Sequence, residues 1–131
     1  MQTLHPPGWP RPRGYANGVA AEGRLVFVAG QIGWDETGAF PAEDLPGQVR
    51  RALRNVLAVV AEAGGRPDHV ARMTWYLVDR QDYLANLAPI GDAYREVMGR
   101  HFPAMAVVEV AGLLEARAKV EIEATAVVPG A

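Results

Sequence analysis

The chain has 131 residues, of which 50% are hydrophobic and 21% are charged, and its formal net charge is −2. This length and composition predict one domain with a packed core, spanning 1–131 with a proline-rich extended lead-in over 1–13. The charge balance gives no reason to expect nucleic-acid binding, and the lack of cysteine excludes disulfides and thiolate metal sites. We find neither a signal-peptide pattern nor the roughly 18 apolar residues of a membrane span, so we expect a cytoplasmic protein without a membrane partner.

Two short strands are predicted first, over 15–20 and 24–29, on either side of a turn at 21–23. The second strand contains the continuously apolar run Leu-Val-Phe-Val-Ala, which is typical of a strand buried on both faces. Gly, Pro and Asp turn signals then predict a long loop over 30–46. Loops of this length are often functional.

The next segment is predicted to be a helix. Apolar residues recur at helical spacing from Val49 to Val60, and Gly64-Gly65 ends the pattern. Three arginines occupy the other side of this helix, and we interpret them as a solvated face: Arg50, Arg51 and Arg54.

The second half of the chain alternates strand and helix. We predict a strand over 70–78, a short helical turn at 80–86, a helix over 89–98, and strands over 105–110 and 119–128. The order ββ-α-β-α-ββ predicts an α+β fold, a mixed sheet with both helices on one face.

The last strand indicates what the uncovered sheet face carries. Its apolar residues alternate with Glu121, Glu123 and Thr125, which therefore share the opposite face. A sheet covered by helices on one side only needs a partner on its other side.

Six segments in a fixed order resemble those of the Rid family of reactive-intermediate deaminases, also called YjgF. They are Gly14–Val19, Phe27–Ile32, Asn55–Gly64, Met73–Asp79, Phe102–Ala104 and Val120–Ala124. The resemblance covers about Gly14 to Val128. It implies a chorismate-mutase-like fold, a homotrimer whose sheets surround a central barrel, and ligand clefts between adjacent subunits.

The resemblance also assigns a candidate catalytic residue. Deaminases of this family hydrolyse enamines or imines, and a carboxylate can hold the attacking water and accept its proton. Glu121 matches the family glutamate given this role, although by periodicity alone it is an exposed acidic residue on a strand. Glu123 follows on the same face at roughly 7 Å, which permits a carboxylate pair, but we favour a structural or trimer-lining role.

Five further residues are candidates for substrate binding, and each also has a purely structural interpretation. Tyr15 could donate a hydrogen bond, and Gly30 and Gln31 could present backbone groups because glycine permits close approach. Trp34 lies in the loop that borders the family's ligand cleft. Glu109 lies on the strand that begins near residue 105 and could approach that cleft.

Met105 is the main departure from the family pattern, because the family's best-known members have an arginine there that holds a substrate carboxylate. Methionine cannot bind a carboxylate, so we count Met105 in the substrate site but expect altered specificity. Leu87 stands where the family often has asparagine, with Asn86 adjacent. Arg72 or Arg117 could supply a replacement cation.

Two functions therefore remain open: an enamine/imine deaminase with altered specificity, and a non-catalytic trimer that binds a small molecule. A ribonuclease or translation inhibitor is disfavoured by the acidic charge balance and the lack of a histidine acid/base pair. We expect no cofactor. We also expect no metal, because His5, His69 and His101 are widely scattered.

Overall fold

The computed structural model describes residues 1–130, and its centre is a four-stranded sheet. In spatial order the strands are β3 (Arg24–Gln31), β6 (Val120–Val128), β4 (Val70–Leu77) and β5 (Ala104–Glu109). Strands β3, β6 and β4 are antiparallel, whereas β4 and β5 run parallel. The predicted mixed sheet is confirmed.

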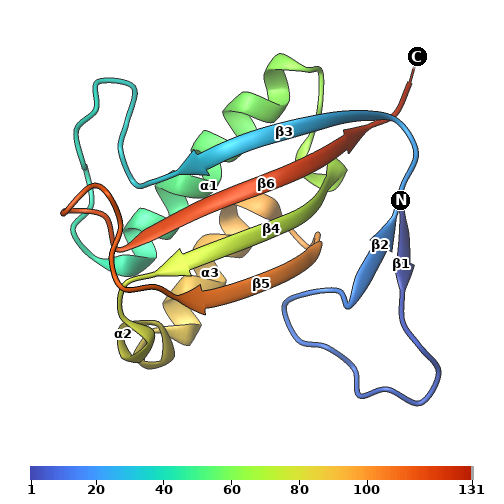
Figure 1. Cartoon of the computed structure of the whole chain (residues 1–131), viewed down its shortest axis with the longest axis horizontal. Helices are drawn as coiled ribbons and strands as arrows, with labels where there is room; N and C mark the ends of the chain where they lie inside the picture. Colours follow the sequence, from blue (N-terminus) through green and yellow to red (C-terminus); the bar gives the residue numbers. More distant parts are fainter. Residues whose placement is uncertain (131) are drawn as a thin grey trace.

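The two long helices lie side by side on one face of this sheet (Figure 1). They are α1 (Leu45–Glu62) and α3 (Leu87–Met98); the short helix α2 (Arg80–Ala85) precedes α3, and a 3₁₀ turn, η1 (Pro67–His69), precedes β4. The predicted one-sided helical layer is confirmed. The opposite sheet face, which we call the open face, carries no helix.

The core lies between the helices and the sheet. Alternate residues along each strand point toward the helices and form the sheet side of the core. Strand β4 buries Met73, Trp75 and Leu77, and β6 buries every second residue from Val120 to Val128. Helix α1 contributes a fully buried apolar stripe, comprising Leu45, Val49, Ala52, Leu53, Val56 and Val60. Each large apolar side chain buried in this way contributes about 1.5–3 kcal/mol, so this layer anchors α1 firmly to the sheet.

The N-terminal segment differs from the expectation. Strand β1 (Gln2–Leu4) pairs antiparallel with β2 (Gly18–Ala20) in a separate two-stranded sheet, a pairing that the sequence analysis did not predict. Strand β2 is also shorter than predicted, and it pairs with β1 rather than β3. All of β1 is exposed, so its sequence carries no apolar alternation that could reveal the pairing.

The prediction that the strand after residue 24 is buried on both faces is wrong for the single protomer. Strand β3 is an edge strand, and Leu25 and Phe27 on the open face are 58% and 75% exposed. The apolar run arises because Val28 faces the helices while its neighbours face the uncovered side.

The helix ends follow local signals. The Asp79 carboxylate accepts hydrogen bonds from the amides of Gln81 and Asp82 and so caps α2. Helix α3 begins two residues earlier than predicted, which places Pro89 in the first turn, where its missing N–H costs nothing. Gly99, with φ +67°, ends α3 as predicted.

Candidate active site on the open sheet face

Glu121 is the second residue of β6 and lies half-buried on the open face. It is in register with Tyr76 of β4, at the end of the sheet where β3 runs into the long loop. The predicted alternation therefore holds: Glu121 faces away from the helices, between β3 and β4.

The Glu121 carboxylate lies directly against Gly30. A methyl group on Gly30 would approach Oε2 of Glu121 to 2.6 Å and Cγ to 2.9 Å, so no larger residue fits without moving the glutamate. The pairing of β3 with β6 shifts register between Val28 and Gln31, and such bulges often stand beside active sites. The structure thus brings together three predicted site residues, Glu121, Gly30 and Gln31.

The loop after Gly30 is held in a defined shape. Two side chains of α1 donate to the Trp34 carbonyl: Nδ2 of Asn55 at 2.8 Å and Nε of Arg51 at 3.3 Å. The Asp35 carboxylate accepts from Thr37, whose hydroxyl is the main cause of a lowered Asp35 pKa. Trp34 is 41% exposed, in the loop that follows Gly30.

A second polar cluster lies beside Glu121 on the open face, and our sequence interpretation missed part of it. The Tyr76 hydroxyl donates to Glu123 at 2.5 Å, and this bond is the main cause of a raised Tyr76 pKa. Arg72, Thr74 and Glu123 also line a cavity of about 290 Å³. Alternation along the strand over 70–78 places Tyr76 on this face, which is the signal that could have identified it.

Met105 and Tyr15 belong to a different part of the protomer. Met105 is in register with Met73 and packs against the core, on the helix-covered face. Tyr15 is held near the start of β5, because the amide of the next residue, Ala16, donates to the Pro103 carbonyl at 3.0 Å. Since Glu121 lies on the open face, one protomer alone does not bring Met105 and Glu121 together.

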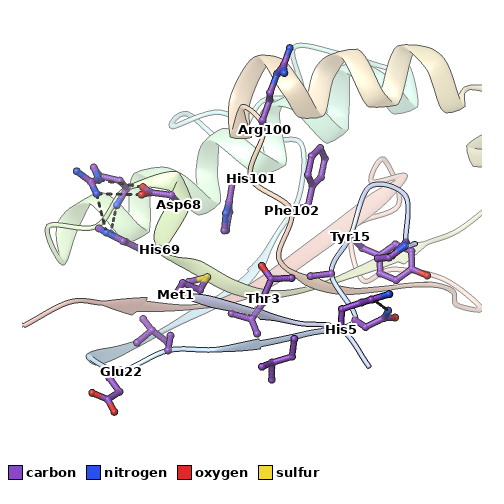
Figure 2. Close-up of a pocket in the computed structure, with 18 of the residues that line it drawn as sticks. Met1, Thr3, His5, Tyr15, Glu22, Asp68, His69, Arg100, His101 and Phe102 are labelled. Carbon is purple, nitrogen blue, oxygen red and sulfur yellow. Dashed lines mark hydrogen bonds and ion pairs between the residues drawn. The ribbon is translucent and has the colours of Figure 1, made fainter. Parts of the chain in front are cut away.

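A cavity of about 980 Å³ lies between the N-terminal sheet and the residues that flank β4 and β5, and Tyr15 lines it. His101 points toward Met1 and Thr3 in this cavity, whereas Arg100 points away from them (Figure 2). Nε2 of His101 is hydrogen-bonded to the Val70 carbonyl at 2.6 Å. Glu121 does not line this cavity.

The remaining candidates are engaged in structural contacts. Glu109 accepts from the Arg80 amide at 2.7 Å at the start of α2, and it is not brought together with Glu121. Arg117 pairs with Glu115 and lies 4.6 Å above the Phe40 ring. The replacement cations considered above are therefore placed apart: Arg72 on the open face and Arg117 against the long loop.

Asn86 lies between α2 and α3, and Leu87 is the first residue of α3. The Asn86 amide donates to the backbone and side chain of Asp82, whereas Leu87 at the start of α3 is 53% exposed. Among residues 1–130 we find no cluster of acidic and histidine side chains placed to hold a metal. None of the helices in this described part is long and apolar enough to cross a membrane.

Comparison with known proteins identifies the family to which the chain belongs. Residues 10–128 match the family model described as Endoribonuclease L-PSP. The 2-iminobutanoate/2-iminopropanoate deaminase of Salmonella typhimurium is 36% identical over 116 residues, covering 86% of each chain. The chain belongs to the Rid (YjgF) family.

Solved structures of this family share the fold. The Rid-family protein YyfB from Yersinia pestis superposes with a TM-score of 0.85 at 30% identity, covering 97% of this chain and 98% of its own. TdcF from Escherichia coli, solved with bound serine, has a TM-score of 0.68 at 34% identity, covering 97% of this chain and 98% of its own. The predicted family and α+β fold are confirmed.

Proposed function

We propose that this chain is a Rid-family deaminase that hydrolyses a reactive enamine or imine to a carbonyl compound and ammonia. The observation that carries the proposal is the Glu121 carboxylate held against Gly30 at a bulge on the open face. The matching relative from Salmonella typhimurium is named as an imine deaminase, and it spans nearly the same length.

The chemistry needs one well-placed carboxylate. Glu121 would hold a water molecule and accept its proton as the oxygen attacks the imine carbon. The resulting carbinolamine carries a hydroxyl and an amine on one carbon. Transfer of the proton to the nitrogen lets the C–N bond break, so ammonia leaves and the carbonyl forms.

The complete site would be shared between subunits. Glu121, Gly30 and Gln31 would form one half on the open face, and Trp34 would join them from the adjoining loop. Tyr15 and Met105 would form the other half, contributed by an adjacent copy. This division, together with the exposed apolar side chains on the open face, supports the homotrimer that the family resemblance implies.

The substrate would differ from a small α-imino acid. Met105 offers no charge to a carboxylate, and the exposed Leu87 replaces a polar side chain of the family pattern. An unpaired carboxylate in such an environment loses several kcal/mol of solvation. We therefore propose a substrate whose reacting carbon carries no adjacent carboxylate, or one that presents its acidic group elsewhere, acted on in the cytoplasm.

The test is ammonia release from freshly generated imines with and without an α-carboxylate. We expect the imine without the carboxylate to react faster, and Glu121→Gln to lower turnover about 100-fold or more, a typical effect of losing a general base. Glu123→Gln is the matched control on the same strand face and should retain turnover within about threefold. Wild-type turnover in Glu121→Gln would remove the proposed base.

The alternative is a trimer that binds a small molecule without converting it. The apolar substitution at Met105 and the exposed Leu87 favour it, since both remove polar contacts. A metabolite that raises the melting temperature while no imine in the panel releases ammonia would favour this alternative.

A further inference from the structure

Helix α1 carries a line of three polar side chains along one edge, and all three reach backbone groups of the loops around Glu121. They are Gln48, Arg51 and Asn55, which recur at the three- and four-residue spacing of one helix face. Gln48 is only 1% exposed, the one buried polar side chain among the residues described. We call these three residues the polar edge of α1.

Asn55 and Arg51 tether the loop that follows Gly30. The Asn55 amide donates to the carbonyls of Ile32, at 3.1 Å, and Trp34, at 2.8 Å. Arg51 adds a bond to the Trp34 carbonyl and pairs with Asn55 Oδ1 at 3.1 Å. The backbone that leaves the Gly30-Gln31 segment is therefore bound to the helix at two alternate residues, Ile32 and Trp34.

Gln48 tethers the approach to Glu121 from the other side. Its Oε1 accepts from the Lys119 amide at 2.8 Å, two residues before Glu121, and its Nε2 donates to the Arg117 carbonyl at 3.1 Å. Gly33 also lies against this side chain, because a methyl group on Gly33 would come within 2.9 Å of Gln48 Cβ. One helix side chain thus contacts both segments that meet at the site.

We propose that the polar edge of α1 positions Glu121 against Gly30-Gln31, so that Gln48, Arg51 and Asn55 are positioning residues for the deamination proposed above. Helix α1 is anchored by its buried apolar stripe, so bonds to it transfer that rigidity to two loops with little core of their own. Placement matters because a displacement of about 1 Å at a reacting group can cost about 100-fold in rate.

Asn55→Asp is the sharpest test. Aspartate keeps an oxygen for Arg51 but cannot donate to the Ile32 and Trp34 carbonyls. We expect kcat for ammonia release to fall about 10-fold or more while KM changes less than about threefold. Arg54→Ala is the matched control: it lies one residue away and loses its ion pair with Glu96 on α3, but it contacts neither loop. Its kcat should equal that of the wild type.

A spectroscopic measurement makes the test independent of turnover. In protein labelled with 5-fluorotryptophan, Trp34, Trp75 and Trp9 each give a fluorine resonance, which Trp34→Phe assigns. We expect Asn55→Asp to move the Trp34 resonance and leave that of the buried Trp75 in place. Arg51→Gln should move the Trp34 resonance in the same direction by a smaller amount. This variant replaces Asn55→Asp in the test if Asn55→Asp does not fold.

Two results would overturn the positioning role. One is an unmoved Trp34 resonance with wild-type kcat in Asn55→Asp; the other is an equal shift of all three resonances, which would indicate general loosening. If the wild-type protein releases no ammonia from any imine, the proposed function fails, and the Trp34 resonance in the same variants still decides whether the polar edge positions the loop.

Discussion

At the scale of the residue, the tightest contact in the candidate site is between Gly30 and the Glu121 carboxylate. Gly30 has no side chain where Glu121 Oε2 lies, and its φ is not in the left-handed region. Its role is therefore spatial rather than conformational: it leaves room for the carboxylate to lie over the backbone of β3.

Gly30→Ala should consequently damage activity more than folding. The methyl group would meet the Glu121 side chain at 2.6–2.9 Å and force another rotamer. We expect ammonia release to fall about 10-fold or more, with a small change in melting temperature, since the backbone accepts alanine. Gly112→Ala, which meets nothing within 4 Å, is the control. Unchanged activity in Gly30→Ala would show that Glu121 needs no fixed position.

At the scale of the element, the short helix α2 shows how acidic residues are used for structure. Its first amides meet two carboxylates: Asp79 accepts from Gln81 at 2.9 Å, and Glu109 accepts from Arg80 at 2.7 Å. Acidic groups at a helix N-terminus accept hydrogen bonds from the free N–H groups, and their negative charge interacts favourably with the positive end of the helix dipole. This arrangement gives Glu109 a structural contact at the start of α2.

Asp79→Ala should destabilise the protein by about 1 kcal/mol, the usual cost of losing an N-cap. Denaturant unfolding measures this as a lower midpoint with an unchanged slope. Asp92→Ala, which breaks only the exposed pair with Arg95 within α3, should change stability by less than about 0.5 kcal/mol. Equal effects from the two substitutions would mean that the cap contributes nothing specific.

At the scale of the whole molecule, the open face is the feature that the protomer leaves uncovered. Phe27 and Leu25 on the edge strand β3 are 75% and 58% exposed, and Val108 on the opposite edge strand β5 is 43% exposed. The polar pair of Tyr76 and Glu123 lies on the two central strands between them. Large apolar side chains exposed together on one uncovered face are typical of an interaction surface. A second and third copy of the same sheet would cover it, as the family resemblance implies.

Phe27→Asp should therefore weaken assembly. Burying an unpaired carboxylate between sheets costs several kcal/mol, enough to shift a trimer toward monomer. Light scattering after gel filtration gives the mass of each species. Val59→Asp, on the solvent side of α1, should leave the mass unchanged. A wild-type protein of monomer mass, or a Phe27→Asp variant of wild-type mass, would contradict the shared site.

Local patterns were sufficient for most of the elements. The spacing of Val49, Leu53 and Val56 predicts α1 and its buried side, and alternation around Glu121 predicts which face it occupies. Such periodicity depends only on residues that are close in sequence. The prediction of β3 as buried on both faces was wrong because an apolar run does not distinguish a central strand from an edge strand.

The sequence by itself determined the fold class, the family and the side of β6 on which Glu121 lies, because periodicity and motif order are properties of neighbouring residues. Only the tertiary structure decided that Gly30 lies against Glu121, that Asn55 and Gln48 hold the adjoining loops, and that Met105 faces the other side of the sheet. These relations join segments tens of residues apart, and their geometry follows from strand order and packing rather than from local spacing.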